Sequence, residues 1–125
     1  MATQRIGIIM HGVTGRMGMN QHLIRSVLAI RDQGGVRLKS GDLLLPDPII
    51  VGRNGGKIAE LAKKHGVERY TTDLDAALAN PDDTVFFDAA STQMRPGLLR
   101  KAIDAGKHVY SEKPVSEGLQ EAVEI

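Results

Sequence analysis

Three glycines with the spacing G-x-x-G-x-x-G follow the first apolar run of the chain: Gly12, Gly15 and Gly18. At a helix N-terminus the backbone N–H groups lack partners and carry partial positive charge, so they bind phosphate oxygens. Glycines allow the tight turn, the close approach of a pyrophosphate and the packing of helix on strand. Thr14 and Arg16 add a hydroxyl group and a cation. We therefore expect a dinucleotide site, the alternative being a glycine-rich turn without a ligand. Its expected contacts are Gly12, Thr14, Gly15, Arg16, Met17 and Gly18.

The end of the second expected strand bears on the choice of dinucleotide. NAD-specific domains carry a carboxylate there for the adenosine ribose, about 20 residues after the glycine loop. That distance leads to Asp32, which we place at a helix end instead. The strand expected at residues 49–51 is followed by Arg53 and Asn54, without a carboxylate. Because the planar donor fork of arginine fits a 2′-phosphate, we expect both residues to contact the cofactor and NADP to be preferred, with NAD possible. The alternatives are an Arg53 that is solvated or that stacks on the adenine of NAD.

These motifs require elements that bring them together, and the chain alternates strand-like and helix-like patterns. We expect strands at residues 5–10, 49–51, 69–71, 84–88 and 108–110. We expect helices at residues 16–31, 57–65, 73–79 and 96–105, and another from residue 116 that is interrupted at the end of the chain. Strands alternating with helices over short loops predict an α/β fold with a doubly wound parallel sheet, the Rossmann fold.

One connection does not fit this pattern. Residues 32–47 are longer than the roughly 2–6 residues usual between a helix and the next strand. Val36 and Leu38 lie opposite Leu43 and Leu45 across Ser40 and Gly41. We therefore expect a small β-hairpin insertion.

Composition limits the class of protein. The 125 residues suffice for one domain, and 42% apolar with 25% charged residues is typical of a globular protein. A net charge of +1 and only four aromatic Phe and Tyr residues give no basis for binding nucleic acid. The absence of cysteine excludes disulfides and thiolate chemistry, and the four histidines lack metal-ligand spacing. No apolar run approaches the roughly 20 residues that span a bilayer. The absence of cysteine fits a cytoplasmic protein, which is the location that we expect.

The segment at residues 105–114, AGKHVYSEKP, follows the fifth expected strand. It resembles the AGKHVxxEKP segment of the Gfo/Idh/MocA family of sugar and polyol oxidoreductases, whose members also have a glycine loop after the first strand. The resemblance implies that residues 1–125 are the N-terminal dinucleotide-binding domain, and that a C-terminal α+β substrate domain is absent from this chain. It also implies an NAD(P)-dependent oxidoreductase that transfers a hydride between nicotinamide and a hydroxyl or carbonyl group of a sugar, polyol or related molecule.

The same resemblance assigns site residues. Lys113 is expected to contact both cofactor and substrate as the catalytic residue, and a lysine at the carboxyl end of a strand lies where α/β sheets bind ligands. Glu112 is expected to position Lys113 or to meet the nicotinamide ribose. Ser91 and Thr92 offer hydroxyl groups where family members commonly have Thr-Pro-Asn, so this sequence departs from the family pattern there. Asp88 is either structural or a cofactor contact.

Alternatives to this assignment remain. One is an NADP-binding sensor or regulatory module without catalysis. Another is an extended short-chain dehydrogenase, although Tyr110 and Lys113 lie at a strand end and not on a helix. A third is a domain similar to that of dihydrodipicolinate reductase, which shares the G-R-M-G portion of the loop but lacks Glu-Lys-Pro. We expect the isolated chain to be inactive, and the full-length protein to be a homo-oligomer that acts on a small-molecule sugar or polyol without nucleic acid or membrane partners.

Overall fold

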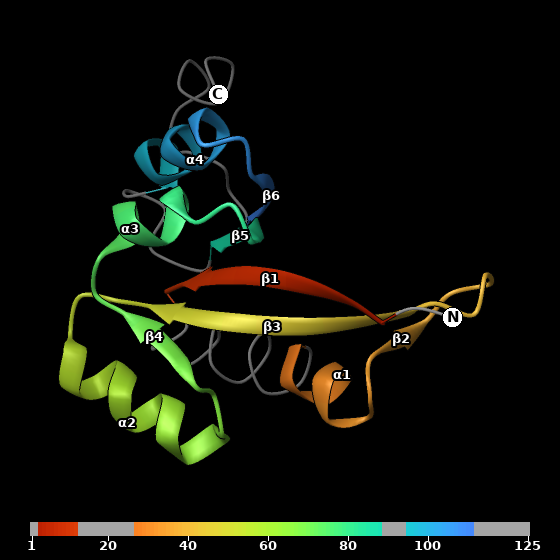
Figure 1. Cartoon of the computed structure of the whole chain (residues 1–125). Helices are drawn as coiled ribbons and strands as arrows, with labels where there is room; N and C mark the ends of the chain where they lie inside the picture. Colours follow the sequence, from red (N-terminus) through yellow and green to blue (C-terminus); the bar gives the residue numbers. More distant parts are fainter. Residues whose placement is uncertain (1–2, 13–26, 89–94, 112–125) are drawn as a thin grey trace.

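The computed structural model describes residues 3–12, 27–88 and 95–111 of the chain (Figure 1). The strands are β1 (Thr3–His11), β2 (Val36–Arg37), β3 (Leu43–Val51), β4 (Arg69–Thr71), β5 (Asp83–Asp88) and β6 (His108–Ser111). The helices are α1 (Ala29–Asp32), α2 (Gly55–His65), α3 (Leu74–Ala79) and α4 (Arg95–Asp104). Of the helix expected at residues 16–31, only the last part lies in the described residues, and the helix expected from residue 116 lies outside them. No helix in the described ranges is long and apolar enough to cross a membrane.

The strands form one sheet in the order β2-β3-β1-β5-β6, and β4 also pairs with β3. All pairings are parallel except that of β2 with β3. From β1 the chain proceeds to β3 and β4 on one side, then returns to β5 and β6 on the other side. The strand order therefore reverses between β1 and β5, which is the point where doubly wound sheets bind ligands. The predicted Rossmann topology is confirmed.

Helices lie on both faces of the sheet (Figure 1), and the side chains of the central strands pack alternately against one face or the other. On one face, Met10, Ile50 and Phe87 form a buried cluster with Ile58 and Leu61 of α2. On the other face the cluster consists of residues from β1, β3 and β5 with residues from α3 and α4. Its buried members are Ile9, Val51, Ala77, Leu78, Phe86, Leu98, Leu99 and Ala102. Neighbours in the sequence face opposite sides because the side chains of a strand alternate.

Strand β3 is longer than the predicted strand at residues 49–51, and it contains Pro46 and Pro48. Prolines argue against a central strand because they lack the N–H that pairs with a neighbour. Here β1 pairs with β3 along its whole length, whereas the other edge is occupied only by β2 at Leu43 and Leu44 and by β4 from Ile49 onward. Pro46 and Pro48 lie between these two pairings. No described strand on that edge loses a hydrogen bond to them.

The predicted hairpin is present, but its register differs by one residue. Val36 pairs with Leu44 and Arg37 with Leu43, so Leu38 and Leu45 do not take the expected positions. The Leu38 N–H donates to the Asp42 carbonyl at 2.8 Å, and the Gly41 N–H donates to the Leu38 carbonyl at 2.9 Å. Gly41 has φ 91°, and such three-residue loops with glycine in the left-handed region set the register of a hairpin. The second arm is part of β3 and not a separate insertion.

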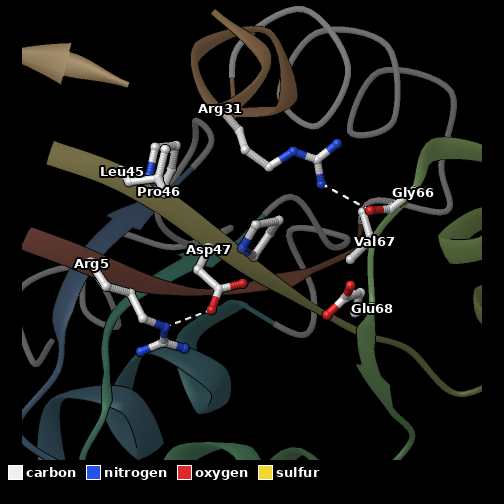
Figure 2. Close-up of a pocket in the computed structure, with 9 residues that line it drawn as sticks. Arg5, Arg31, Leu45, Pro46, Asp47, Gly66, Val67 and Glu68 are labelled. Carbon is white, nitrogen blue, oxygen red and sulfur yellow. Dashed lines mark hydrogen bonds and ion pairs between the residues drawn. The ribbon is translucent and has the colours of Figure 1, made fainter. Parts of the chain in front are cut away.

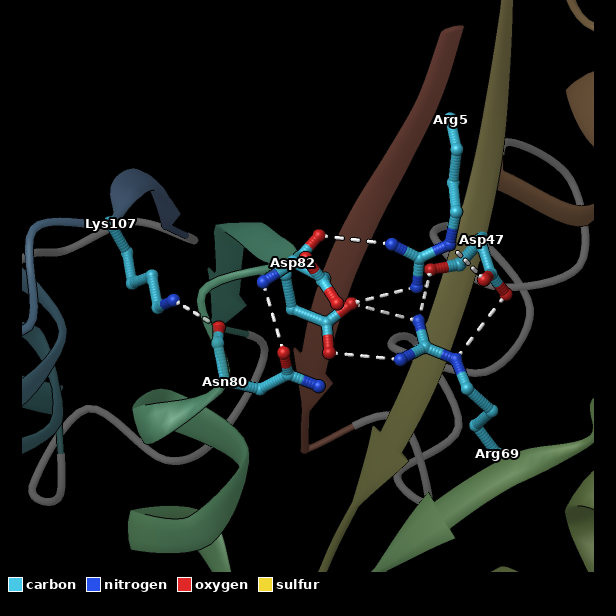
Figure 3. Close-up of polar contacts among 7 residues, drawn as sticks. Arg5, Asp47, Arg69, Asn80, Asp82 and Lys107 are labelled. Atoms are coloured by element: carbon cyan, nitrogen blue, oxygen red, sulfur yellow. Dashed lines mark hydrogen bonds and ion pairs between the residues drawn. The ribbon is translucent and has the colours of Figure 1, made fainter.

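A charged cluster joins β1, β3, β4 and β5 away from the carboxyl ends of the strands (Figure 3). Asp83 is fully buried and accepts hydrogen bonds from Arg69 Nη1 and Nη2, both at 2.9 Å, and from Arg5 Nη2 at 3.1 Å. Both arginines also form ion pairs with Asp47. Burial acts to raise the pKa of Asp83, but the hydrogen bonds and charges of Arg69 and Arg5 outweigh it and hold this pKa below its ordinary value. The hydrogen bond to Asp47 is the main cause of a raised pKa at Arg5.

Candidate functional site

The parallel pairing aligns the carboxyl ends of the strands in one row along the edge of the sheet. His11 is in register with Val51 on β3 and with Asp88 on β5, and the same row continues to the strands outside them. Across the sheet its members are Thr71, Val51, His11, Asp88 and Ser111. Each segment expected to contact the cofactor begins within three residues of this row in the sequence: residues 12–18, 53–54, 91–92 and 112–113. The topology thus brings the strand ends that precede these four segments to one edge of the sheet.

The glycine loop begins at the end of β1. Gly12 has φ 82°, in the left-handed region where side chains other than glycine are strained, so the sharp exit from the strand depends on this residue. It is half-buried beside the end of β1. The other assigned residues of the loop lie outside the described residues, and their contacts remain predictions. These are Thr14, Gly15, Arg16, Met17 and Gly18.

The exit from β3 carries the residues assigned to the adenosine end of the cofactor. The Gly52 N–H donates to the Thr71 carbonyl at 3.3 Å, which continues the pairing of β3 with β4 beyond Val51. Arg53 follows with an exposed side chain, and no carboxylate occurs among residues 51–54. Asp32 ends α1, as expected, and is therefore not at the end of β3.

Asn54 has a structural role that the sequence analysis did not assign. Its Oδ1 accepts a hydrogen bond from the Lys57 N–H at 3.1 Å, so this side chain caps the N-terminus of α2. Asparagine is among the most favourable residues at the N-cap of a helix. The position of Asn54 shortly before a helical pattern is the sequence signal from which this cap could have been predicted. At the other end, Gly66 with φ 67° ends the helix as predicted.

Two ionisable side chains lie at the centre of the row. Both His11 and Asp88 are buried, and the His11 Nδ1 lies 3.8 Å from the Asp88 Oδ1. The His11 ring packs near Phe86, with 6.4 Å between ring centroids. Of the residues assigned beyond β5 and β6, Ser91, Thr92, Glu112 and Lys113 lie outside the described residues, so their roles remain predictions. Among the described residues no group of His, Asp and Glu side chains is arranged to hold a metal ion.

A hollow in the described part of the chain lies elsewhere. A pocket of about 410 Å³ is lined by residues of β3 before Ile49, by the segment after α2, and by Arg5 and Arg31 (Figure 2). Arg5 forms an ion pair with Asp47 there, and Arg31 Nη1 donates to the Gly66 carbonyl at 3.1 Å. These groups are already partnered, and the pocket precedes the carboxyl ends of β3 and β4. Because α/β sheets bind cofactors at the carboxyl ends, this pocket is not the dinucleotide site.

A parallel sheet with a strand-order reversal and a glycine at the exit of β1 defines a dinucleotide-binding Rossmann domain. The chain belongs to the Gfo/Idh/MocA family, described as an oxidoreductase family with an NAD-binding Rossmann fold, because the family model matches residues 6–125. The resemblance seen at residues 105–114 is thereby confirmed, and the short-chain dehydrogenase and dihydrodipicolinate reductase alternatives are not supported.

Several proteins similar to the chain carry the names of sugar or polyol dehydrogenases. The chain is 49% identical over 123 residues to the D-xylose dehydrogenase of Paenarthrobacter nicotinovorans, covering 98% of this chain and 32% of that protein. Levoglucosan dehydrogenase, solved in complex with NADH and levoglucosan, is 26% identical with a TM-score of 0.78, covering 96% of this chain and 30% of that one. Apo scyllo-inositol dehydrogenase from Lactobacillus casei, 21% identical with a TM-score of 0.71, shares the fold over 99% of this chain and 32% of its own. The chain spans about a third of the length of these relatives.

Proposed function

We infer that this chain is the cofactor domain of an NADP-preferring dehydrogenase that transfers a hydride between nicotinamide and a hydroxyl or carbonyl group of a sugar or polyol. The observation that carries the NADP preference is the exit of β3, where Arg53 is exposed and no carboxylate occurs among residues 51–54. A carboxylate in that place would accept hydrogen bonds from the ribose hydroxyls of NAD and repel a 2′-phosphate. An arginine attracts the phosphate and matches its geometry.

The residues at the edge of the sheet divide the work of holding the cofactor. Gly12 lets the chain turn sharply out of β1, and the N–H groups of the residues that follow it in the sequence are proposed to bind the pyrophosphate. Arg53 is proposed for the 2′-phosphate, and Ser91, Thr92 and Glu112 for the nicotinamide half. The cofactor, when bound, supplies the hydride chemistry. Lys113 is proposed to hold the reacting oxygen of the substrate and to balance charge while the hydride moves.

The sugar or polyol class is supported by the activities of the relatives, since D-xylose and levoglucosan dehydrogenases both act on sugars by name. These relatives are about three times as long as the chain. We place most substrate contacts in a second, α+β domain of the full-length protein. Homo-oligomer formation is proposed for that longer protein as well.

The cofactor preference is tested by titrating the chain with NADPH and with NADH and following the fluorescence of the reduced nicotinamide. NADPH is expected to bind more tightly. Arg53→Ala should weaken NADPH binding about tenfold, the lower end for hydrogen bonds to a charged group because Arg53 is exposed, and leave NADH within about twofold. Arg37→Ala is the matched control: it removes an exposed arginine from β2, at the opposite end of β3, and should change neither affinity.

The same titration separates the competing roles of Arg53. Stacking on adenine would weaken both cofactors by the same factor in Arg53→Ala, because the adenine is common to both. A solvated side chain would leave both affinities unchanged. Either result would refute the role of Arg53 at the 2′-phosphate, and NADH binding as tight as NADPH in the unmodified chain would refute the NADP preference.

A further inference from the structure

A lysine occupies the N-terminal turn of α2, where the helix itself disfavours a cation. Lys57 is the third residue of α2, and the first turn contains no acidic residue. The N–H groups of a first turn carry partial positive charge, so acidic side chains stabilise this end of a helix and basic ones destabilise it. The last turn, where cations are favourable, carries Lys63, Lys64 and His65. Lys57 therefore departs from a rule that the other end of the helix follows.

This lysine lies beside the residue proposed for the 2′-phosphate. Arg53 precedes Lys57 by four residues, just over one helical turn, and both side chains are exposed. The Lys57 N–H donates to the Asn54 Oδ1 at 3.1 Å, which ties the lysine backbone to the turn that carries Arg53. Because helical side chains incline toward the N-terminus, the stem of Lys57 leads toward the same turn. Two cations and the positive end of α2 therefore gather at the exit of β3.

No carboxylate in the described part of the chain offsets these charges. Lys57 Nζ forms no hydrogen bond or ion pair with any described residue, Glu60 of the same helix included. Asp73, which follows β4 nearby, caps α3 instead, where its Oδ1 accepts from the Ala76 N–H at 3.0 Å. The charge at the exit of β3 is thus complementary to an anionic ligand.

We propose that Lys57 is a specificity-determining residue that acts together with Arg53 on the 2′-phosphate of NADP. A phosphate monoester carries about two negative charges near neutral pH, so one arginine leaves it half neutralised. The ammonium group of Lys57 supplies a second charge, and the positive end of α2 adds to it. NADH has a hydroxyl group in place of this phosphate and gains little from either cation. This inference rests on the proposed function and names the second residue that discriminates between the two cofactors.

The test measures both cofactor affinities in variants of this lysine. Lys57→Gln removes the charge but keeps a long side chain that favours a helix, whereas Lys57→Arg keeps the charge. Lys57→Gln should weaken NADPH binding about fivefold, the upper end for an exposed ion pair, and leave NADH within about twofold. Lys57→Arg should retain most of the NADPH affinity. Lys64→Gln is the matched control: it removes an exposed lysine from the last turn of the same helix and should change neither affinity.

The stability of the chain without cofactor gives a second, independent readout. Lys57→Glu places an acidic residue in the first turn of α2, where it forms a capping box with Asn54. Its melting temperature should equal or exceed that of the unmodified chain, while its NADPH affinity falls below that of Lys57→Gln. A lysine with a purely structural role would instead lower the melting temperature when replaced. Such a loss in both Lys57→Gln and Lys57→Glu would contradict the argument from the helix terminus.

The phosphorus NMR signal of the 2′-phosphate in bound NADP locates the effect. Nearby cations favour the dianion, so this phosphate should titrate at a lower pH in the complex than in free NADP, and the lowering should be smaller in Lys57→Gln. An unchanged titration, or equal weakening of NADPH and NADH, would overturn the role of Lys57. If Arg53→Ala removes the preference for NADPH and Lys57→Gln does not, the proposed function stands and this inference fails. Equal affinity of the unmodified chain for NADPH and NADH would overturn both.

Discussion

Asp83→Asn should destabilise the chain by about 3 kcal/mol, at the lower end of the cost of breaking a buried ion pair. The carboxylate is fully buried and accepts hydrogen bonds from Arg69 Nη1, Arg69 Nη2 and Arg5 Nη2 at 2.9, 2.9 and 3.1 Å. An asparagine keeps one acceptor oxygen but directs an NH2 group at the guanidinium groups. We use the lower end of this energy range because the Arg5 and Arg69 side chains are 40% and 27% exposed. Water can therefore solvate part of each guanidinium group after the carboxylate is removed.

Urea unfolding followed by circular dichroism measures this loss. With an m-value of about 1–3 kcal/mol/M for a small domain, the midpoint should fall by roughly 1–3 M. Asp75→Asn is the matched control, because the same substitution there breaks an exposed ion pair with Lys101 at 3.3 Å. Exposed pairs contribute about 0–1 kcal/mol, so its midpoint should change little. Equal and small effects of the two substitutions would refute the reasoning from burial.

The pH dependence of the Asp83 effect has a definite sign. The pKa of Asp83 is lowered in the folded chain from its ordinary value of 3.8, so the unfolded chain binds more protons between the two values. The contribution of Asp83 is therefore complete above about pH 4 and is lost as the pH falls through the folded pKa. The stability difference between the unmodified chain and Asp83→Asn should stay constant from about pH 8 to pH 5 and shrink below about pH 4. A difference that shrinks between pH 8 and pH 5 would contradict this assignment.

Two further predictions, each with a control substitution, concern local structure and are tested by thermal unfolding. Gly7→Ala should destabilise by about 1–3 kcal/mol, because its Cβ would lie 2.7 Å from the Asp82 carbonyl oxygen and 2.8 Å from the Asp83 Cα, both backbone atoms. Gly97→Ala in α4 should be neutral or stabilising, because outside the backbone of α4 no described atom lies within 4 Å of the added Cβ. Comparable losses in Gly7→Ala and Gly97→Ala would contradict the packing argument. Asn54→Ala should destabilise the chain by about 1 kcal/mol because it removes the side chain that caps α2. Asn54→Ser should keep most of the original stability. Unchanged stability in Asn54→Ala would exclude a stabilising role of this cap.

Elements with local signals could be predicted from the sequence. The apolar run at residues 5–10 lies within β1, and the glycine at position 66 ends α2 at the expected residue. The extension of β3 could not be predicted, because Pro46 and Pro48 argue against a strand unless its edge lacks a partner. That gap depends on where β2 and β4 pair. The charged cluster was also missed, since Arg5 and Asp83 are separated by 78 residues and only the topology brings them together.

The candidate site was predictable in its class but not in its details. Ten residues at positions 105–114 indicated the family, and the match over residues 6–125 confirms it. The hairpin places the end of β3 farther along the sequence from the glycine loop than is typical of such domains. The absence of a carboxylate could be recognised only after the end of this strand had been located at Val51. The contact between His11 and Asp88 was not predicted, since it depends on the register of β1 with β5.

We propose that a nicotinamide dinucleotide binds at the carboxyl ends of the strands. An NMR titration of the chain with NADPH, with assigned backbone amides, tests it most directly. Saturable shifts are expected at Gly12, Gly52 and Arg53, with little change at Arg31 and Val67, which line the pocket beside the earlier part of β3. Shifts concentrated at Arg31 and Val67, or no saturable shifts with either NADPH or NADH, would contradict it.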